Sequence, residues 1–106
     1  LMEAALILKS NPQFVFVLIG DGAKLAKLIS MKESGGLDNV LFLPYQSAHD
    51  FPLAMAAADV GVVTLGVGAE GISVPSKTYV NMAAGLCLLT ISPKGSELNR
   101  LVEQYD

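Results

Sequence analysis

Residues 14–22, FVFVLIGDG, decide the fold of this chain. The first six are apolar without interruption and rich in branched side chains, and two glycines separated by one residue follow at once. A short continuous apolar run is typical of a strand buried on both faces, and glycines permit the tight turn that must follow it. Apolar residues with helical spacing come next, at Leu25, Leu28 and Ile29. The stretch therefore predicts a strand, a turn and a helix in succession.

The same unit recurs along the chain. Short apolar runs that we expect to be buried strands also lie at residues 40–43, 60–65 and 86–91. Helical spacing is found again after each of these runs, in three groups: Leu53, Met55 and Ala56; Tyr79, Met82 and Ala83; Leu98, Leu101, Val102 and Tyr105. Strands that alternate with helices predict an α/β fold with a Rossmann-like parallel sheet, helices on both faces and right-handed crossovers.

Both ends of the chain fall inside helical patterns. Leu1 opens such a pattern without a capping residue, and Asp106 stops within another. A helix before the first strand also implies a further strand upstream. We therefore expect residues 1–106 to be a single domain cut from a larger protein.

Composition and charge exclude several classes of protein. The chain is 52% hydrophobic with 10 Gly and 5 Pro in 106 residues, which is typical of a compact globular domain. The net charge is −3 and the seven Lys and Arg residues are scattered, so no basic stripe is present to bind nucleic acid. The apolar runs are far shorter than the roughly 20 residues of a transmembrane helix. We expect no membrane segment and no nucleic-acid partner.

The single cysteine bears on the cellular compartment. Cys87 cannot form a disulfide within the chain, and it lies in an apolar run. We expect a small buried side chain there, in a protein of a reducing, cytoplasmic compartment.

In open α/β sheets ligands bind at the carboxyl ends of the strands, so the loops at those ends are the candidate sites. The first such loop contains Gly20 and Gly22, which allow the backbone to turn tightly and to approach a phosphate or a sugar. A purely structural turn is an equal alternative. The loop has neither the third glycine of a dinucleotide fingerprint nor the Gly-Lys-Ser/Thr ending of a P-loop, so kinase and ATPase chemistry have no support.

The second loop, residues 43–47, begins with Leu43, Pro44 and Tyr45. Its backbone groups could hold a flat base. The alternative is a plain connection to a helix that Asp50 or Ser47 caps. His49 in this segment is interpreted as a solvated polar residue.

The third loop, residues 66–77, is long and rich in glycine. Ser73 and Ser76 precede or open a helix whose first amides are donors at the positive end of the helix dipole, so an anion fits there. Lys77 in the first helical turn conflicts with the dipole unless an anionic ligand lies close by; a solvent-facing lysine is the alternative. Glu70 accepts hydrogen bonds when ionised and suits sugar hydroxyls, whereas a lone carboxylate is poorly suited to two-carboxylate hydrolysis.

A family resemblance emerges from the order of these motifs. The chain runs from Gly20-Asp21-Gly22 through NVLFLP at 39–44, AADV at 57–60 and Glu70-Gly71 to MAAG at 82–85. This order resembles family 4 of the retaining glycosyltransferases, specifically the C-terminal donor-binding domain of the two-domain GT-B fold. The resemblance covers nearly the whole chain except the first helix. The segment SVPSKTY at 73–79 is similar to bacterial members that build surface polysaccharides.

The resemblance implies a nucleoside diphosphate sugar as the donor, held in a cleft between two domains, with no cofactor and no bound metal. By resemblance, Glu70 is the catalytic-site glutamate placed against the donor sugar. The backbone amides of Gly71, Ile72 and Ser73 match positions near the sugar and the diphosphate. The segment from Leu43 to Tyr45 matches the base-binding segment, and Gly20 and Gly22 match a loop that lines the donor pocket.

The chain departs from the family pattern at one ribose ligand. Val80 stands where the second glutamate of the motif is expected, although an ungapped count from Glu70 falls on Thr78. The basic pair that binds the diphosphate belongs, by resemblance, to the segment upstream of this chain. Lys77 or Lys24 could substitute for it in part.

The same resemblance implies further properties of the larger protein. An N-terminal domain would bind a glycan or a lipid-linked acceptor, the intact enzyme would act in the cytoplasm or at the inner face of the membrane, and this chain alone would be inactive. Two alternatives stay open: a nucleotide-sugar 2-epimerase of the same architecture, and a binding module without catalysis.

Overall fold

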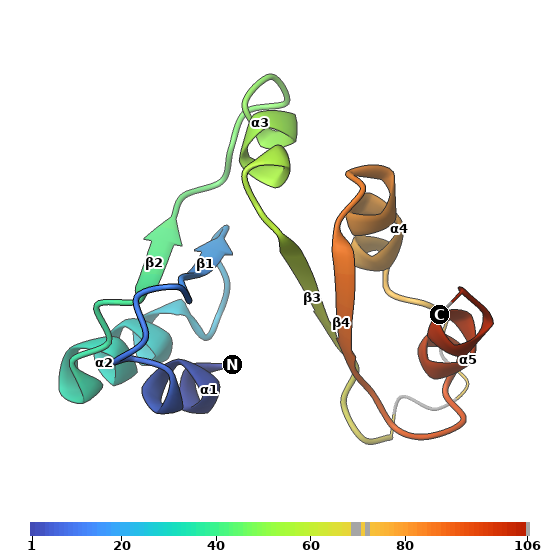
Figure 1. The fold of residues 1–106 in the computed structure, drawn as a ribbon, viewed down its shortest axis with the longest axis horizontal. Coiled ribbons are helices and arrows are strands. Elements are labelled where there is room, and N and C mark those ends of the chain that lie inside the picture. Colours follow the sequence, from blue (N-terminus) through green and yellow to red (C-terminus); the bar gives the residue numbers. More distant parts are fainter. Residues whose placement is uncertain (69–70, 72, 106) are drawn as a thin grey trace. The chain divides into compact units, whose positions relative to one another are not determined.

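The computed structural model describes residues 1–68, 71 and 73–105. Helices and strands alternate throughout, in two compact units, residues 1–48 (unit 1) and 49–106 (unit 2) (Figure 1). The elements of unit 1 are α1 (Met2–Ile7), β1 (Phe16–Ile19), α2 (Leu25–Gly35) and β2 (Val40–Leu43). Those of unit 2 are α3 (Phe51–Ala56), β3 (Val60–Thr64), α4 (Ser76–Ala83), β4 (Cys87–Ile91) and α5 (Glu97–Tyr105). The Rossmann-like α/β class with parallel strands is confirmed, while the single domain over 1–106 stays a prediction.

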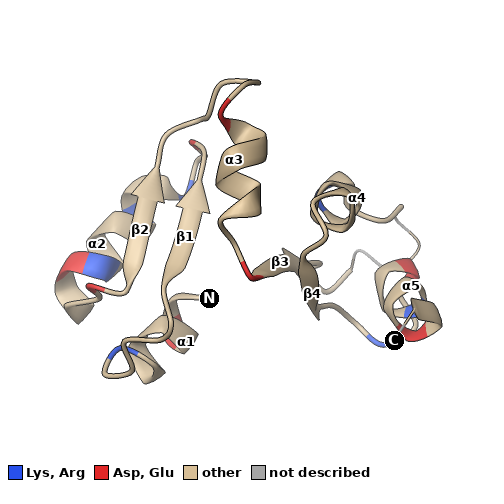
Figure 2. Ribbon diagram, turned by 45° about the horizontal axis from the view of Figure 1, so that its top comes forward, with Lys and Arg blue, Asp and Glu red and all other residues tan. Residues whose placement is uncertain are grey.

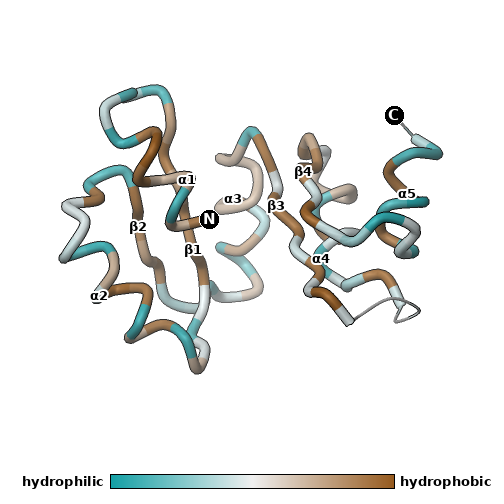
Figure 3. Tube along the Cα trace, turned by 90° about the horizontal axis from the view of Figure 1, so that it is seen from below, coloured by the Kyte–Doolittle hydropathy of each residue, from teal (hydrophilic) through white to brown (hydrophobic). Residues whose placement is uncertain are grey.

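Unit 1 is a parallel strand pair covered by two helices. β1 and β2 are in register from Phe16 opposite Val40 to Ile19 opposite Leu43, and both are apolar along their length (Figure 3). The core consists of buried residues with partly buried hydrophobic residues packed against them: Met2, Ala5, Leu37 and Val40, then Phe16, Leu18, Leu28 and Phe42. α2 ends at Gly35, where Gly36 adopts the left-handed conformation that favours glycine after a helix.

A buried side-chain hydrogen bond joins α1 to the segment before β2. Asn39 Nδ2 donates to the backbone oxygen of Ala5 at 2.9 Å. The last carbonyls of a helix lack partners within the helix, so an external donor stabilises the end of α1. This bond fixes the helix against the strand pair.

Unit 2 repeats the parallel pair. β3 and β4 are in register from Val60 opposite Cys87 to Thr64 opposite Ile91, and α4 packs against both strands. Val63 and Leu98 are fully buried. The predicted cap of the last helix is confirmed, because the hydroxyl of Ser96 accepts a hydrogen bond from the backbone N–H of Asn99 at 3.2 Å.

The expectation that the strands are buried on both faces is wrong for the described chain. Val17 and Leu41 in unit 1, and Leu89 and Ile91 in unit 2, are exposed, whereas their neighbours along each strand are more deeply buried. Successive side chains of a strand point to opposite faces, so this alternation means that, within the described residues, one face of each strand pair is more exposed than the other. Cys87 is likewise exposed and not buried as expected, since it shares the more exposed face of β4 with Leu89 and Ile91.

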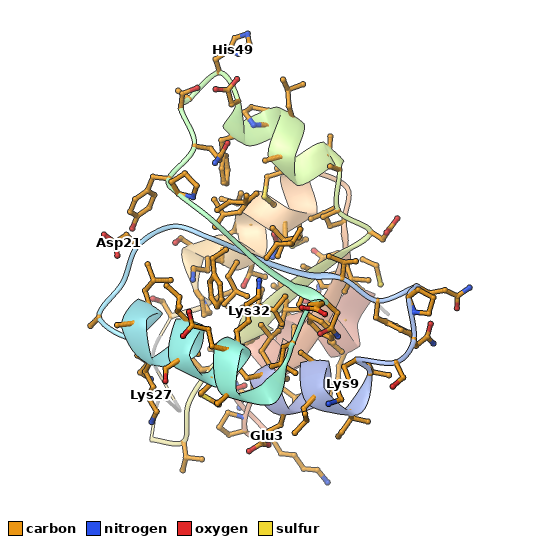
Figure 4. The ribbon with its side chains drawn as sticks, turned by 90° about the vertical axis from the view of Figure 1, so that its left-hand side faces the viewer. Glu3, Lys9, Asp21, Lys27, Lys32 and His49 are labelled. Carbon is orange, nitrogen blue, oxygen red and sulfur yellow. The ribbon has the colours of Figure 1, made fainter. Side chains whose placement is uncertain are left out.

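Asp50 lies at the predicted N-cap position of α3 but does not cap the helix with its side chain. Its Oδ1 lies 3.0 Å from Nδ1 of His49, which is exposed at the helix start (Figure 4).

Charged residues are scattered over both units of the described chain (Figure 2). No helix in the part of the chain that the structure describes is both long enough and apolar enough to cross a membrane.

Candidate functional site

The two loops of unit 1 meet at the carboxyl ends of β1 and β2. The backbone N–H of Gly20 donates to the backbone oxygen of Leu43 at 3.0 Å and so extends the strand pairing by one step. Gly20 has a φ of 124°, a backbone conformation that favours glycine. The chain can therefore turn away from β1 immediately after this bond.

The side chain of Tyr45 folds back over that turn. A Cβ placed on Gly20 would lie 3.4 Å from Tyr45 Cε1 and 3.5 Å from Tyr45 Cζ, so the ring lies against the backbone of Gly20. The Tyr45 hydroxyl donates to the backbone oxygen of Asp21 at 3.1 Å. Figure 4 shows Asp21 on this turn. Tyr45 thus connects the loop after β2 to the loop after β1.

A cavity of about 500 Å³ lies between these two loops and is partly open to solvent. We call it the unit 1 cavity. It is lined by Gly20, Asp21, Leu25, Ile29, Phe42, Leu43, Pro44 and Tyr45. Four aliphatic or aromatic side chains from α2 and β2 form an apolar wall, and one carboxylate lies on the turn. The volume falls in the range of small-molecule sites, and the mixture of apolar surface with few polar groups is typical of them.

A second cavity of about 210 Å³ lies between α1 and α2, with Met2, Glu3 and Met31 among its lining residues. It is not at the carboxyl ends of the strands. Because ligands of open α/β sheets bind at those ends, the unit 1 cavity is the better candidate site.

The structure brings together four of the site residues that the sequence predicts. Gly20, Leu43, Pro44 and Tyr45 all line the unit 1 cavity. Gly22 lies on the same turn but outside this lining. Its φ is not left-handed, and a Cβ there would meet nothing within 4 Å.

The remaining predicted residues belong to unit 2, around the start of α4. Ser76 is the first residue of this helix, and Pro75 precedes it without a side-chain cap. Ser73, Ser76 and Lys77 are all exposed, and Gly71 has a φ of 84°. An uncapped helix start with exposed hydroxyls and a cation is a suitable environment for an anion. Glu70 and Ile72 lie outside the described residues.

The structure distinguishes the two positions that could replace the second glutamate of the family motif. Thr78 is completely buried, and its Oγ1 has no hydrogen-bond partner in the described part of the chain. Val80 is 40% exposed on α4. Of these two side chains, only that of Val80 reaches the surface.

Sequence reasoning missed half of the cavity lining, namely Asp21, Leu25, Ile29 and Phe42. A signal was present, because Leu25 and Ile29 are four residues apart and lie on one face of α2.

The described residues contain no group of three or more His, Cys, Asp or Glu side chains placed to hold a metal ion.

Comparison with curated proteins gives two relatives. The chain is 37% identical over 106 residues to a protein of Pseudomonas aeruginosa named as the glycosyltransferase WbjE, with 95% of this chain covered. It is 31% identical over 104 residues, with 98% of the chain covered, to a protein of Escherichia coli strain K12 named as the colanic acid biosynthesis glycosyl transferase WcaI. The match covers 25% of each relative, so the chain spans about a quarter of their length.

No solved structure matches the chain significantly. The family described as Glycosyl transferases group 1 matches residues 1–98, nearly the whole chain. With the parallel α/β architecture and the two relatives, this match establishes the assignment: the chain belongs to the group 1 glycosyl transferases.

Proposed function

We propose that residues 1–106 are the truncated C-terminal, donor-binding domain of a retaining GT-B glycosyltransferase of family 4. The intact protein would transfer a sugar from a nucleoside diphosphate sugar to a glycan or a lipid-linked acceptor. The observation that carries the proposal is the unit 1 cavity, which lies at the carboxyl ends of two parallel strands.

The unit 1 cavity suits the base of the donor. Leu25, Ile29 and Phe42 offer apolar surface to a flat ring. The backbone groups of the loop after β2, at Leu43 and Pro44, could hydrogen-bond the edge of that ring. This division between an apolar wall and backbone groups gives both affinity and orientation.

The start of α4 suits the diphosphate. Its first amides, the hydroxyl of Ser76 and the ammonium group of Lys77 favour a negative charge. Glu70 would accept hydrogen bonds from the donor sugar, and the amides of Gly71, Ile72 and Ser73 would approach the sugar and the diphosphate.

The proposed mechanism follows from where charge develops. The bond that breaks lies within the donor, between the anomeric carbon of the sugar and the diphosphate. Its cleavage leaves negative charge on the departing diphosphate, and oriented amides, a helix dipole and a cation stabilise that charge in the transition state. The acceptor hydroxyl would come from another domain, and closure of the two domains would complete the site. This chain by itself would bind donor without transferring sugar.

The name of one relative supports a role in polysaccharide synthesis. The name of the Escherichia coli relative refers to colanic acid biosynthesis. We propose a surface polysaccharide or its lipid-linked precursor as the acceptor of the intact protein, which would act in the cytoplasm or at the inner face of the membrane. A nucleotide-sugar 2-epimerase is not favoured, because the family and both relatives are described as glycosyl transferases. Product analysis separates a new glycoside from an epimerised nucleotide sugar.

The direct test is nucleotide binding by the intact protein. Ligand-detected NMR with UDP, GDP and their common sugar conjugates should show saturation transfer to base and ribose protons of one nucleotide. Leu43→Glu should weaken this binding at least tenfold, because it places a charged, solvated carboxylate on the apolar lining that would receive the base. Leu41→Glu is the matched control, since Leu41 is similarly exposed on β2 but outside the lining (44% against 39%). Absence of binding by the wild-type protein would contradict the proposal.

A further inference from the structure

Tyr45 makes two contacts with the turn after β1, and neither is local in sequence. Its ring lies against the backbone of Gly20, and its hydroxyl donates to the backbone oxygen of Asp21, 24 residues away. The rest of the ring is free, because Tyr45 is 75% exposed. A large aromatic side chain that is mostly exposed, yet contacts the turn through both its ring and its hydroxyl, is not part of the hydrophobic core of unit 1.

Backbone hydrogen bonds fix the two ends of the turn that Tyr45 contacts: Gly20 donates to Leu43, and Leu25 donates to Gly22. Between these ends, within the described residues, the Tyr45 hydroxyl supplies the only hydrogen bond to Asp21. Glycine has the largest conformational freedom of any residue, so a turn that contains Gly20 and Gly22 loses much entropy when it is ordered. The ring and the hydroxyl of Tyr45 restrict this freedom before any ligand binds.

Gly20 contacts the Tyr45 ring and has a backbone conformation that favours glycine. A Cβ at Gly20 would meet the ring at 3.4–3.5 Å, an ordinary contact distance, whereas the φ of 124° is strained for any residue with a Cβ. The conformation of the turn, and not the space beside the ring, therefore favours glycine at this position. Both residues also line the unit 1 cavity.

We propose that Tyr45 is a positioning residue of the donor site, a clamp that holds the Gly20–Asp21 wall of the unit 1 cavity in its ligand-binding form. This inference rests on the proposed function of that cavity. It assigns the Tyr45 side chain a role toward the protein's own backbone, in addition to the base contacts of the loop. Ordering the wall in advance lowers the entropic cost of binding and so raises affinity for the nucleotide.

The experiment separates the hydroxyl from the ring. Tyr45→Phe removes the hydrogen bond to Asp21 and keeps the ring, and we expect nucleotide affinity to fall about threefold. Tyr45→Ala removes both, and we expect a fall of roughly tenfold or more. In the intact enzyme the loss should appear in KM for the donor with kcat little changed, whereas partial unfolding would lower the active fraction and the melting temperature.

The matched controls are Tyr105→Phe and Tyr105→Ala. Tyr105 is 70% exposed at the end of α5 and is not part of the cavity lining. Its variants should bind nucleotide like the wild type. The amide signals of Gly20 and Asp21 in the free protein should shift in Tyr45→Phe but not in Tyr105→Phe.

The outcomes are distinct. Graded weakening from Tyr45→Phe to Tyr45→Ala, with unchanged Tyr105 variants, supports the clamp. If the wild-type protein binds nucleotide and Tyr45→Ala binds it equally well, the clamp is overturned and the proposed function is not. If Tyr45→Ala binds nucleotide more tightly than the wild type, the clamp is also overturned, because the ring then obstructs the cavity. A wild-type protein that binds no nucleotide overturns the proposed function, and the clamp with it.

Discussion

The side-chain amide of Asn81 lies directly against the backbone of Gly61. A Cβ placed on Gly61 would be 2.5 Å from Asn81 Cγ and 2.6 Å from Asn81 Nδ2, closer than real Cβ contacts allow. Asn81 is buried in α4 and Gly61 is buried in β3. The glycine therefore sets how closely α4 approaches β3.

Gly61→Ala should destabilise the protein by about 1–3 kcal/mol, since the new methyl group forces α4 and β3 apart. The free energy of unfolding, measured with urea, gives the change. Gly66→Ala is the control, because a Cβ there meets nothing within 4 Å. The double variant with Asn81→Ala should recover part of the lost unfolding free energy. If its unfolding free energy falls by the sum of the losses in the two single variants, the contact between Gly61 and Asn81 is not the cause.

Asn39→Ala should cost about 1–2 kcal/mol, because it removes the buried donor to the backbone oxygen of Ala5 at the end of α1. Thermal unfolding measures the loss. The neighbouring Asp38→Ala should leave stability within about 0.5 kcal/mol, since Asp38 is exposed. Equal melting temperatures for the two variants would show that the bond contributes nothing.

Thr78→Val should leave the protein as stable as the wild type or stabilise it by about 1 kcal/mol. The reason is that Thr78 Oγ1 is buried without a partner in the described residues, and the valine has nearly the same shape without the hydroxyl. Thr78→Ser, which keeps the hydroxyl and loses the methyl group, should destabilise instead. A clear loss of stability in Thr78→Val, seen in urea unfolding, would show that the hydroxyl has a partner.

Val80→Glu should strengthen nucleotide binding. Val80 is one of the two positions proposed for the family's ribose-binding glutamate and is exposed on α4, so a carboxylate there could accept hydrogen bonds from ribose hydroxyls. We expect an increase of about threefold to tenfold, measured by titration of the intact protein with the nucleoside diphosphate. The control is Val80→Gln, which can also accept a hydrogen bond but without charge. Weaker binding by both variants would indicate that position 80 does not face the ribose.

Glu70→Gln in the intact enzyme should lower the rate of transfer by about tenfold or more and leave the melting temperature unchanged, because the residue is proposed to contact the donor and not the core. Donor turnover and thermal unfolding are measured on the same preparation. Glu103→Gln in α5 is the control for removal of one negative charge. Unchanged turnover in Glu70→Gln would remove this residue from the site.

Most elements could be predicted from local pattern. The strand at residues 40–43 has the predicted bounds, and the cap at Ser96 is as expected. Both depend on neighbours in sequence: branched apolar runs favour strands, and a serine before a helix accepts a nearby backbone hydrogen bond. Membership of the glycosyl transferases could also be predicted, because the spacing of their motifs is a property of the sequence.

The site was predictable only in part, since its residues are separated along the chain. Gly20 and Tyr45 were each expected in a ligand-binding loop. No pattern in the sequence indicated that the Tyr45 ring lies against the backbone of Gly20. Leu25 and Ile29 were assigned to one face of a helix, but their spacing does not show whether that face packs into the core or lines a cavity.

Local preference therefore settled the order of strands and helices and the positions of the turns, because backbone dihedrals and hydrophobic spacing act over a few residues. Long-range packing settled everything that joins distant segments. Asn39 reaches Ala5 across 34 residues, and Tyr45 reaches Asp21 across 24. The exposure of Cys87 also followed from packing, since it depends on which face of β4 the helices cover. Such contacts form only when the chain has folded, and their geometry depends on the combined packing of several elements, which no short stretch of sequence encodes.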